Sequence, residues 1–388
     1  MLTGQELTLL STSLSGNFDW ELTNFTIDSG SSMSSNSRGC PSSLSPNANN
    51  VCSNQGADKG YGEGDDPSSD GKGGGGAGHG GAGGGGKNYV VGNGDGGLTY
   101  GDPLAPIFMG SGGGKADANG GVGGGAIKIN VTDTFNNSGT ITANGGAGGT
   151  HWTDAGGGGS AGSIWVITDT LTGTGSFSAD GGNGGYSDNT RHGGGGAGGR
   201  ITAHYNTLTD MDISSSSVTG GTTSSGAEYG DEGTLAFIDV DDNNLFISEG
   251  FEFQADANYT NITVYDSLTR INASSVTINA TNLISKGDFN MTCVNTGYDI
   301  EFNFLADANF SDTAIKNQGY TGLTGNDCDL VNLIASSNTQ DYYENIIIES
   351  NNNMTLDFNA NLTIDSSTLT LNNNQDWIIL DYNPQLTL

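Results

Sequence analysis

Two stretches with the same residue pattern decide the fold: Gly124-Gly125-Ala126-Ile127-Lys128-Ile129-Asn130-Val131 and Gly162-Ser163-Ile164-Trp165-Val166-Ile167-Thr168. A third copy begins at Gly199-Arg200-Ile201, so that Ile127, Ile164 and Ile201 lie 37 residues apart at each step. A shorter segment follows inside each unit, and its Ile141 and Phe177 lie 36 residues apart. A repeat of this length indicates stacked supersecondary units.

Apolar and polar side chains alternate within each of these segments. Ile127, Ile129 and Val131 fall on one side and Lys128 and Asn130 on the other, which is the period of a strand with one buried face. A strand this short cannot bury a core alone, whereas stacked copies pair with one another and align like side chains in apolar columns. Because Gly, Ser, Thr and Asn dominate the rest, we expect an all-β fold, specifically a parallel β-helix with glycine-rich arms.

The glycine blocks, such as 156–159 and 193–196, leave two interpretations open. Glycine loses more backbone entropy on folding than any other residue, so the blocks are either flexible surface loops or close-packed chains whose backbones touch. They recur in register with the strands and contain an interspersed alanine, as in Gly145-Gly146-Ala147-Gly148-Gly149. This recurrence favours ordered packing.

Composition divides the chain into three segments. Residues 1–70 read as an N-terminal cap followed by a Ser/Asn-rich loop, residues 71–211 as the glycine-rich repeat solenoid, and residues 212–388 as further β-helix rungs. The last segment has short strands at close spacing with Asn, Asp and Ser turns, which also fits a β-sandwich. Within the second segment, the apolar residues 103–109 are expected to cover one end of the stack.

Charge excludes several classes of partner. The chain has 43 acidic against 11 basic residues and a formal net charge of −32, a surface that repels nucleic acid and anionic headgroups. No run approaches the roughly 20 apolar residues of a membrane span, so we expect no membrane insertion within this chain. The first residues lack the pattern of a secretory signal, and the last residues stop within a strand pattern. We therefore expect a fragment of a longer exported protein.

The four cysteines form two local pairs, Cys40 with Cys52 and Cys293 with Cys328. Four cysteines allow three connectivities, and local pairing is the simplest. Neither pair has the spacing of a zinc site. Disulfides would place the chain in an oxidising compartment, whereas free buried thiols are the alternative.

One acidic turn is a candidate metal site. Asp239, Asp241, Asp242 and Asn243 place oxygen ligands two residues apart, as calcium loops do, although the glycine and the bidentate glutamate of the hand motif are absent. A weak Ca²⁺ site and a solvated turn both fit this pattern. No other cofactor is expected, because the glycine-rich run ending at Lys87 lacks the Ser or Thr that ligates magnesium in a phosphate loop.

Enzyme chemistry has little support in the sequence. A polysaccharide hydrolase needs two carboxylates across the scissile bond, which Asp239, Asp241 and Asp242 could supply. Gly78-His79-Gly80 resembles one piece of the pectin hydrolase signature. In that family the histidine follows the aspartates in the chain, whereas here it precedes them. A lyase needs a basic residue beside an acidic cluster, and Arg270, Lys286 and Lys316 are not close to one in sequence.

Two further groups are candidate surface features. Trp165 faces away from the core side of its strand and, with His204 and Tyr205, would form a ridge for a sugar or a partner; packing under a glycine arm is the alternative. Glycosylation sequons, whose number is close to that expected by chance, occur at Asn130, Asn258, Asn261, Asn272, Asn279, Asn290, Asn309, Asn353 and Asn361.

The glycine blocks also carry a family resemblance. Residues 73–81, 110–114, 143–146 and 195–201, and the Ile238-Asp239-Val240-Asp241-Asp242-Asn243-Asn244 segment that follows, resemble the glycine-rich extracellular β-solenoid surface proteins of archaea and bacteria. The resemblance covers roughly residues 15–250. It implies a right-handed parallel β-helix in the cell envelope and brings no catalytic residues.

These observations together predict a non-enzymatic module at the cell surface. It would act as a spacer, an attachment surface or an assembly surface, and its partners would be cell-surface glycans, other surface proteins or further copies of itself. The alternatives are a carbohydrate-active β-helix enzyme, either hydrolase or lyase, and a viral or phage fibre.

Overall fold

A computed structural model describes residues 2–3, 6–53, 71–87, 95–271, 275–285, 289–293 and 299–317, and then short strands that end at Thr387. Side chains are described as far as Tyr265 and again at 276–281 and 284. The chain divides into two units, Met1–Phe237 and Ile238–Leu388. Strands make up the regular structure, and the one helical element among the described residues is the 3₁₀ turn Ile213–Ser215. The all-β prediction is confirmed, while the three-segment division stays a prediction.

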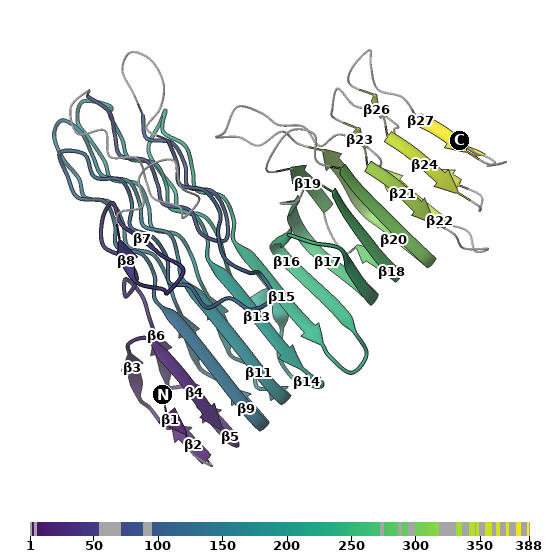
Figure 1. The fold of residues 1–388 in the computed structure, drawn as a ribbon, viewed down its shortest axis with the longest axis horizontal. Coiled ribbons are helices and arrows are strands. Elements are labelled where there is room, and N and C mark those ends of the chain that lie inside the picture. Colours follow the sequence, from purple (N-terminus) through teal and green to yellow (C-terminus); the bar gives the residue numbers. More distant parts are fainter. Residues whose placement is uncertain are drawn as a thin grey trace. The chain divides into compact units, whose positions relative to one another are not determined.

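Parallel strands of the first unit pair in the register that the repeat predicts. The main strands are β4 (Phe18–Leu22), β9 (Ala126–Asn137), β11 (Ser163–Thr172) and β13 (Arg200–Tyr205), which lie side by side in Figure 1. Ile127 pairs with Ile164, and Ile164 pairs with Ile201. The predicted alignment of the three isoleucines is therefore confirmed.

The inward faces of these strands form the core of the first unit. Ile127, Ile164 and Ile201 are almost fully buried, and the same column begins with Phe18, which pairs with Ile127. Further along the strands, β5 (Asn24–Ile27) brings Phe25 against Phe135, with ring centroids 5.1 Å apart in a stacked arrangement. Like side chains thus align on successive strands, as stacking of repeats requires.

A second parallel sheet in this unit uses the shorter segment of each repeat. It contains β3 (Ser13–Ser15), β6 (Ser32–Ser34), β10 (Thr140–Thr142) and β12 (Ser176–Ser178). Ile141 pairs with both Met33 and Phe177, and all three side chains are buried, while hydroxyl residues flank them on each strand. Each full repeat therefore supplies one strand to each of two sheets.

The glycine-rich segments extend beyond the strands as close-packed chains (Figure 1), which we call the glycine bundle; it comprises residues 73–86, 96–97, 110–114, 120–125, 143–149, 156–162, 179–185, 193–199, 218–221 and 230–233. Successive amides of one chain donate to three different neighbours, and the order then repeats. The amides of residues 194–199 donate in turn to the carbonyls of Gly74, Glu228, Gly182, Ala77, Asp231 and Ala179. A period of three residues is that of polyproline II backbone, which forms no hydrogen bonds of its own.

Side chains could not fit between these backbones. A Cβ added to Gly158 would lie 1.9 Å from the carbonyl oxygen of Gly182, and one added to Gly194 would lie 1.9 Å from that of Gly84. Of the two interpretations of the glycine blocks, the structure supports ordered packing. The entropy cost of ordering glycine is offset by backbone hydrogen bonds to chains on several sides.

Residues 103–109 do not cover an end of the stack. Instead they cross the outward side of β11 and β13, where Ser163 Oγ donates to the carbonyl of Phe108 at 2.6 Å and the His204 imidazole contacts the carbonyl of Leu104 at 2.8 Å. The expectation was wrong because the outward face of these strands carries polar groups that bond the backbone of an extended segment.

The second unit is also built from parallel strands. Its first five, after the last residues of β15 (Thr234–Asp239), are β16 (Asn244–Phe253), β17 (Ala257–Ile271), β18 (Ser275–Ser285), β19 (Phe289–Cys293) and β20 (Asp299–Asn317). Shorter strands follow: β21 (Val331–Ala335), β22 (Asp341–Asn345), β23 (Ile347–Ile348), β24 (Met354–Phe358), β25 (Leu362–Ile364), β26 (Thr370–Leu371), β27 (Ile378–Asp381) and β28 (Leu386–Thr387). Described pairs such as Ile262 with Leu283 and Leu356 with Leu380 are parallel. The β-sandwich alternative was therefore wrong, since sandwiches of that kind pair their strands antiparallel.

Asparagine side chains join neighbouring strands of this unit. Asn261 Nδ2 donates to Asn244 Oδ1, and Asn279 Nδ2 donates to Asn258 Oδ1, both at 2.7 Å. Each pair occupies matching positions on adjacent parallel strands. Like amides placed one above another can form such a ladder because each carries both donors and acceptors.

Candidate functional site

We call the loops that join glycine-bundle chains at the end away from the strands the loop end; it comprises residues 115–119, 150–155, 186–192 and 223–229. The first three of these loops are linked to one another, and 223–229 is bonded to the bundle chains 84–87 and 193–195. Isolated bridges pair His151 with Ser187 and Asp154 with Arg191 on neighbouring loops. Arg191 also forms a 2.9 Å ion pair with Asp154, and Thr153 Oγ1 hydrogen-bonds the carboxylate of Asp117. A scaffold of bonded chains therefore holds these loops in fixed positions relative to one another.

Large aromatic side chains are exposed at the loop end. Trp152 is 67% exposed, Tyr186 53% and Tyr229 66%. Exposed aromatic rings with a polar atom at one edge are the side chains that most often anchor binding surfaces. The sequence analysis did not single them out, and the available signal was an aromatic residue in an otherwise Ser/Asp/Thr-rich loop.

The predicted ridge around Trp165 does not form. Tyr205 is only 2% exposed and belongs to the core, whereas Trp165 is half-buried, with Lys128 Nζ 4.7 Å from its ring centre. Alternation along β13 explains the difference, because His204 and Tyr205 are adjacent in sequence and lie on opposite sides of the strand. Trp165 thus pairs with a cation on the next strand.

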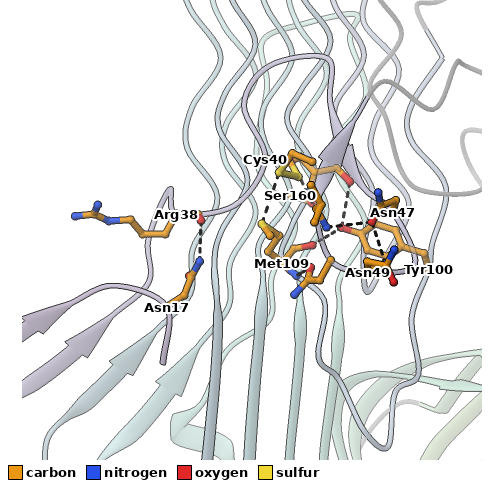
Figure 2. The surroundings of a disulfide bond; sticks show 12 residues. Asn17, Arg38, Cys40, Asn47, Asn49, Tyr100, Met109 and Ser160 are labelled. Atoms are coloured by element: carbon orange, nitrogen blue, oxygen red, sulfur yellow. Dashed lines mark hydrogen bonds between the residues drawn. A yellow bond between two sulfur atoms is a disulfide. The ribbon is translucent and has the colours of Figure 1, made fainter. Parts of the chain in front are cut away.

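The cysteine prediction is confirmed for one pair. Cys40 and Cys52 form a disulfide, shown in Figure 2, which closes a loop in the oxidised chain. The Cys52 sulfur lies 3.7 Å from the thioether of Met109, and Asn50 within the same loop accepts a hydrogen bond from the amide of Met109. The loop is therefore bonded to the 103–109 segment. The second predicted pair, which includes Cys328, lies outside the described side chains.

A buried polar cluster joins the glycine bundle to the strands. His79 is fully buried, its ring stacks on Tyr100 with centroids 4.5 Å apart, and its Nδ1 lies 2.8 Å from the carbonyl of Ala161. A carbonyl only accepts, so Nδ1 carries the proton and the buried Nε2 has no partner in the structure. Burial and the nearby Arg200 guanidinium lower the pKa of His79 to about 3.

Arg200 and Tyr100 complete this cluster. The guanidinium of Arg200 is fully buried and donates to the carbonyl of Tyr100 at 2.9 Å. Burial raises the pKa of the Tyr100 hydroxyl, which donates to the carbonyl of Met109 at 2.7 Å. These groups are enclosed by chain on all sides, so the perturbed pKa values arise from a structural network rather than from a catalytic cleft.

The acidic turn lies between β15 and β16. The carboxylate of Asp239 accepts the amide of Asp242 at 3.1 Å, while Asp241 and Asp242 are exposed and Asn243 has a φ of 55°. Among the described residues, no group of three or more His, Cys, Asp or Glu side chains is placed to hold a metal ion. Calcium binding at this turn stays a prediction.

The predicted glycosylation sites differ in the hydrogen bonds and the exposure of their asparagine side chains. Asn261 and Asn279 use one N–H of their Nδ2 groups in the asparagine ladder, so a glycan there would have to replace the other N–H. Asn130 is half-buried and Asn258 is exposed. Asn272, Asn290, Asn309, Asn353 and Asn361 lie outside the described side chains, as do Arg270, Lys286 and Lys316. Glycosylation stays a prediction.

The hydrolase alternative requires His79 to act together with Asp239 or Asp241. His79 and these aspartates lie in different units, and the His79 side chain is fully buried. Among the described residues no helix has the length and apolar character needed to cross a membrane.

Comparison with known proteins found no match for this chain. No protein-family model matches it, no curated protein is similar to it, and no solved structure matches it.

Proposed function

We propose that this chain is a non-enzymatic, extracellular attachment module of the cell surface. Its coils would form a right-handed parallel β-solenoid, the usual hand of parallel crossovers, and the glycine bundle would hold the loop end away from the strands. The ordered amide network of residues 194–199 is the observation that carries the proposal. Such a network holds loops on a stiff support without using side chains.

Two further observations support this function. The Cys40–Cys52 disulfide is compatible with an oxidising compartment outside the cytoplasm. Trp152, Tyr186 and Tyr229 give the loop end an aromatic surface on a strongly acidic chain, which suits uncharged ligands such as neutral glycans. A surface of this kind binds through rings that are already ordered.

Binding and turnover can be separated in one experiment. The purified chain is incubated with neutral and acidic polysaccharides, and co-sedimentation is measured alongside reducing ends and unsaturated products. We expect binding without products, and we expect the Trp152→Ala, Tyr186→Ala double variant to lose most of the binding. Leu10→Ala is the matched control, because Leu10 is 66% exposed and lies outside the loop end.

Two results would overturn the proposal. Product formation that is abolished by Asp239→Ala or Asp241→Ala would make the chain an enzyme. Binding to no polysaccharide, or binding that the double variant and Leu10→Ala change equally, would remove the loop end as an attachment surface.

A further inference from the structure

A cavity of about 470 Å³ opens where β4 and β9 begin, within the first unit. Phe18, Asp19, Ala126, Ile127 and Lys128 line it from the two strands; Asn17 lines it just before β4, and Asn50, Pro106 and Ile107 line it from two other segments. The volume lies in the range of small-ligand sites, which combine apolar walls with a few converging polar groups. Neither the loop end nor the buried His79 cluster contributes to it.

Apolar groups form one part of the cavity wall. Ile107 is 48% exposed and, with Pro106, supplies apolar side chains to this wall. The Phe18 side chain belongs to the inward column that continues with Ile127, on the side of β4 opposite Asp19. The apolar surface open to a ligand therefore comes from the 106–107 segment.

Charged groups of opposite sign face the same space. Asp19 and Lys128 occupy paired positions on adjacent strands, yet the described ion pairs do not include one between them. The ammonium of Lys128 lies instead over the Trp165 ring. The Asp19 carboxylate is therefore available to a ligand in this cavity as an acceptor, and the Lys128 ammonium becomes available as a donor when it leaves the Trp165 ring.

Two amides add donors and acceptors in fixed positions. Asn17 Oδ1 accepts from Ser35 Oγ and from the amide of Ala126, and Asn17 Nδ2 donates to the carbonyl of Arg38, which leaves one N–H. Figure 2 shows the contact between Asn17 and Arg38. Asn50 Nδ2 donates to the carbonyl of Ile107, which leaves one N–H and one lone pair on Asn50. Both side chains are oriented by the backbone they bond.

We propose that this cavity binds one neutral sugar unit, such as the end of a glycan chain. A sugar hydroxyl both donates and accepts hydrogen bonds. A sugar therefore matches the mixed donors and acceptors of Asp19, Lys128, Asn17 and Asn50 better than a ligand whose charged groups all have one sign. The net charge of −32 disfavours an anionic sugar at long range. The site rests on the proposed attachment function and extends it from the loop end to a second position.

The disulfide loop forms part of this site. Asn50 lies between Cys40 and Cys52 and bonds both Ile107 and Met109, so the loop holds the part of the cavity wall that Asn50 and Ile107 form. Opening the disulfide would loosen Asn50 and weaken its bonds to Ile107 and Met109, while Ser163 and Tyr100 would still hold the 108–109 backbone. Sugar binding should therefore weaken when the disulfide is reduced.

Ligand-observed saturation-transfer NMR with glucose, galactose, mannose and N-acetylglucosamine tests this proposal on the intact chain. We expect saturation of one or more sugars, about tenfold weaker binding in Asp19→Ala and Lys128→Ala, and weaker binding after reduction. Glu21→Ala is the matched control, since Glu21 is exposed on the same strand two residues beyond Asp19 and does not line the cavity. Unfolding midpoints verify that each variant is folded.

The outcomes separate this site from the loop end. Saturation of none of the four sugars, or equal weakening by Glu21→Ala and Asp19→Ala, would refute the cavity site. Glucuronic acid is measured in the same series as an anionic sugar, and its preferential binding would assign the cavity to anionic sugars and refute the proposal as stated. Loss of polysaccharide co-sedimentation in the Trp152→Ala, Tyr186→Ala variant, with monosaccharide binding unchanged, would support both sites as independent.

Discussion

Replacing Gly158 by alanine places one methyl group inside the glycine bundle. The new Cβ would lie 1.9 Å from the carbonyl oxygen of Gly182 and 2.7 Å from the amide nitrogen of Gly196. Both contacts are with backbone, so no side chain can rotate away. At least one neighbouring chain must move.

The magnitude follows from three contributions. Overpacking of this kind costs about 1–3 kcal/mol, and the movement weakens bonds such as Gly158 N–H to Gly194 O at 2.9 Å, each contributing about 1 kcal/mol. Alanine also restricts the unfolded chain, which stabilises by about 0.4–1 kcal/mol. We expect a net loss of roughly 1–4 kcal/mol in the free energy of unfolding.

Denaturant unfolding followed by circular dichroism measures this loss, with Gly16→Ala as the control. A Cβ at Gly16 would meet only the Phe18 ring, at 3.6 Å, so that variant should be unchanged or slightly stabilised. Hydrogen exchange adds a local measurement, because the amides of 156–162 should lose protection in Gly158→Ala alone. If Gly158→Ala and Gly16→Ala differ by less than about 0.5 kcal/mol, the bundle does not pack as described.

Three further expectations concern stability. The pKa of His79 in the folded chain is about 3, below its ordinary 6.5. The stability that neutral His79 contributes is therefore fully present above pH 6.5 and falls toward pH 3 by about 1.4 kcal/mol per pH unit. In His79→Asn the Nδ2 can replace the Nδ1 donor, so this variant should flatten the slope when the free energy of unfolding is measured at several pH values. The Cys40→Ser, Cys52→Ser double variant should lose about 3 kcal/mol, and a reducing agent should destabilise only the parent chain; equal effects on both would contradict a closed loop. Asn279→Asp removes the amide donor to Asn258 and should lower the unfolding free energy by about 1 kcal/mol, whereas an unchanged midpoint would mean that the ladder contributes nothing.

Periodicity in the chain was sufficient to predict the strand pairing. Residues 37 apart must carry like side chains if copies of one unit are to share a buried column, and Ile127, Ile164 and Ile201 do so. The proximity of Cys40 and Cys52 was predicted for a similar local reason, since a short loop brings its ends together at small entropic cost.

Other features could not be read from the chain. Residues 103–109 were assigned to an end of the stack, and Tyr205 to an exposed ridge, because an apolar run and an aromatic residue do not specify which surface they meet. The loop-end aromatics carry no periodic signal, and the cavity of Asp19, Asn50 and Ile107 joins segments that are distant in sequence.

By itself, the sequence determined the all-β composition, the parallel register of the repeats and one disulfide, because alternation and repeat spacing act locally along the chain. Tertiary structure alone decided which glycine chains are neighbours and which side chains meet at the loop end and in the cavity. Glycine has no side chain to distinguish one partner from another, so the choice of partner depends on where the attached strands place each backbone.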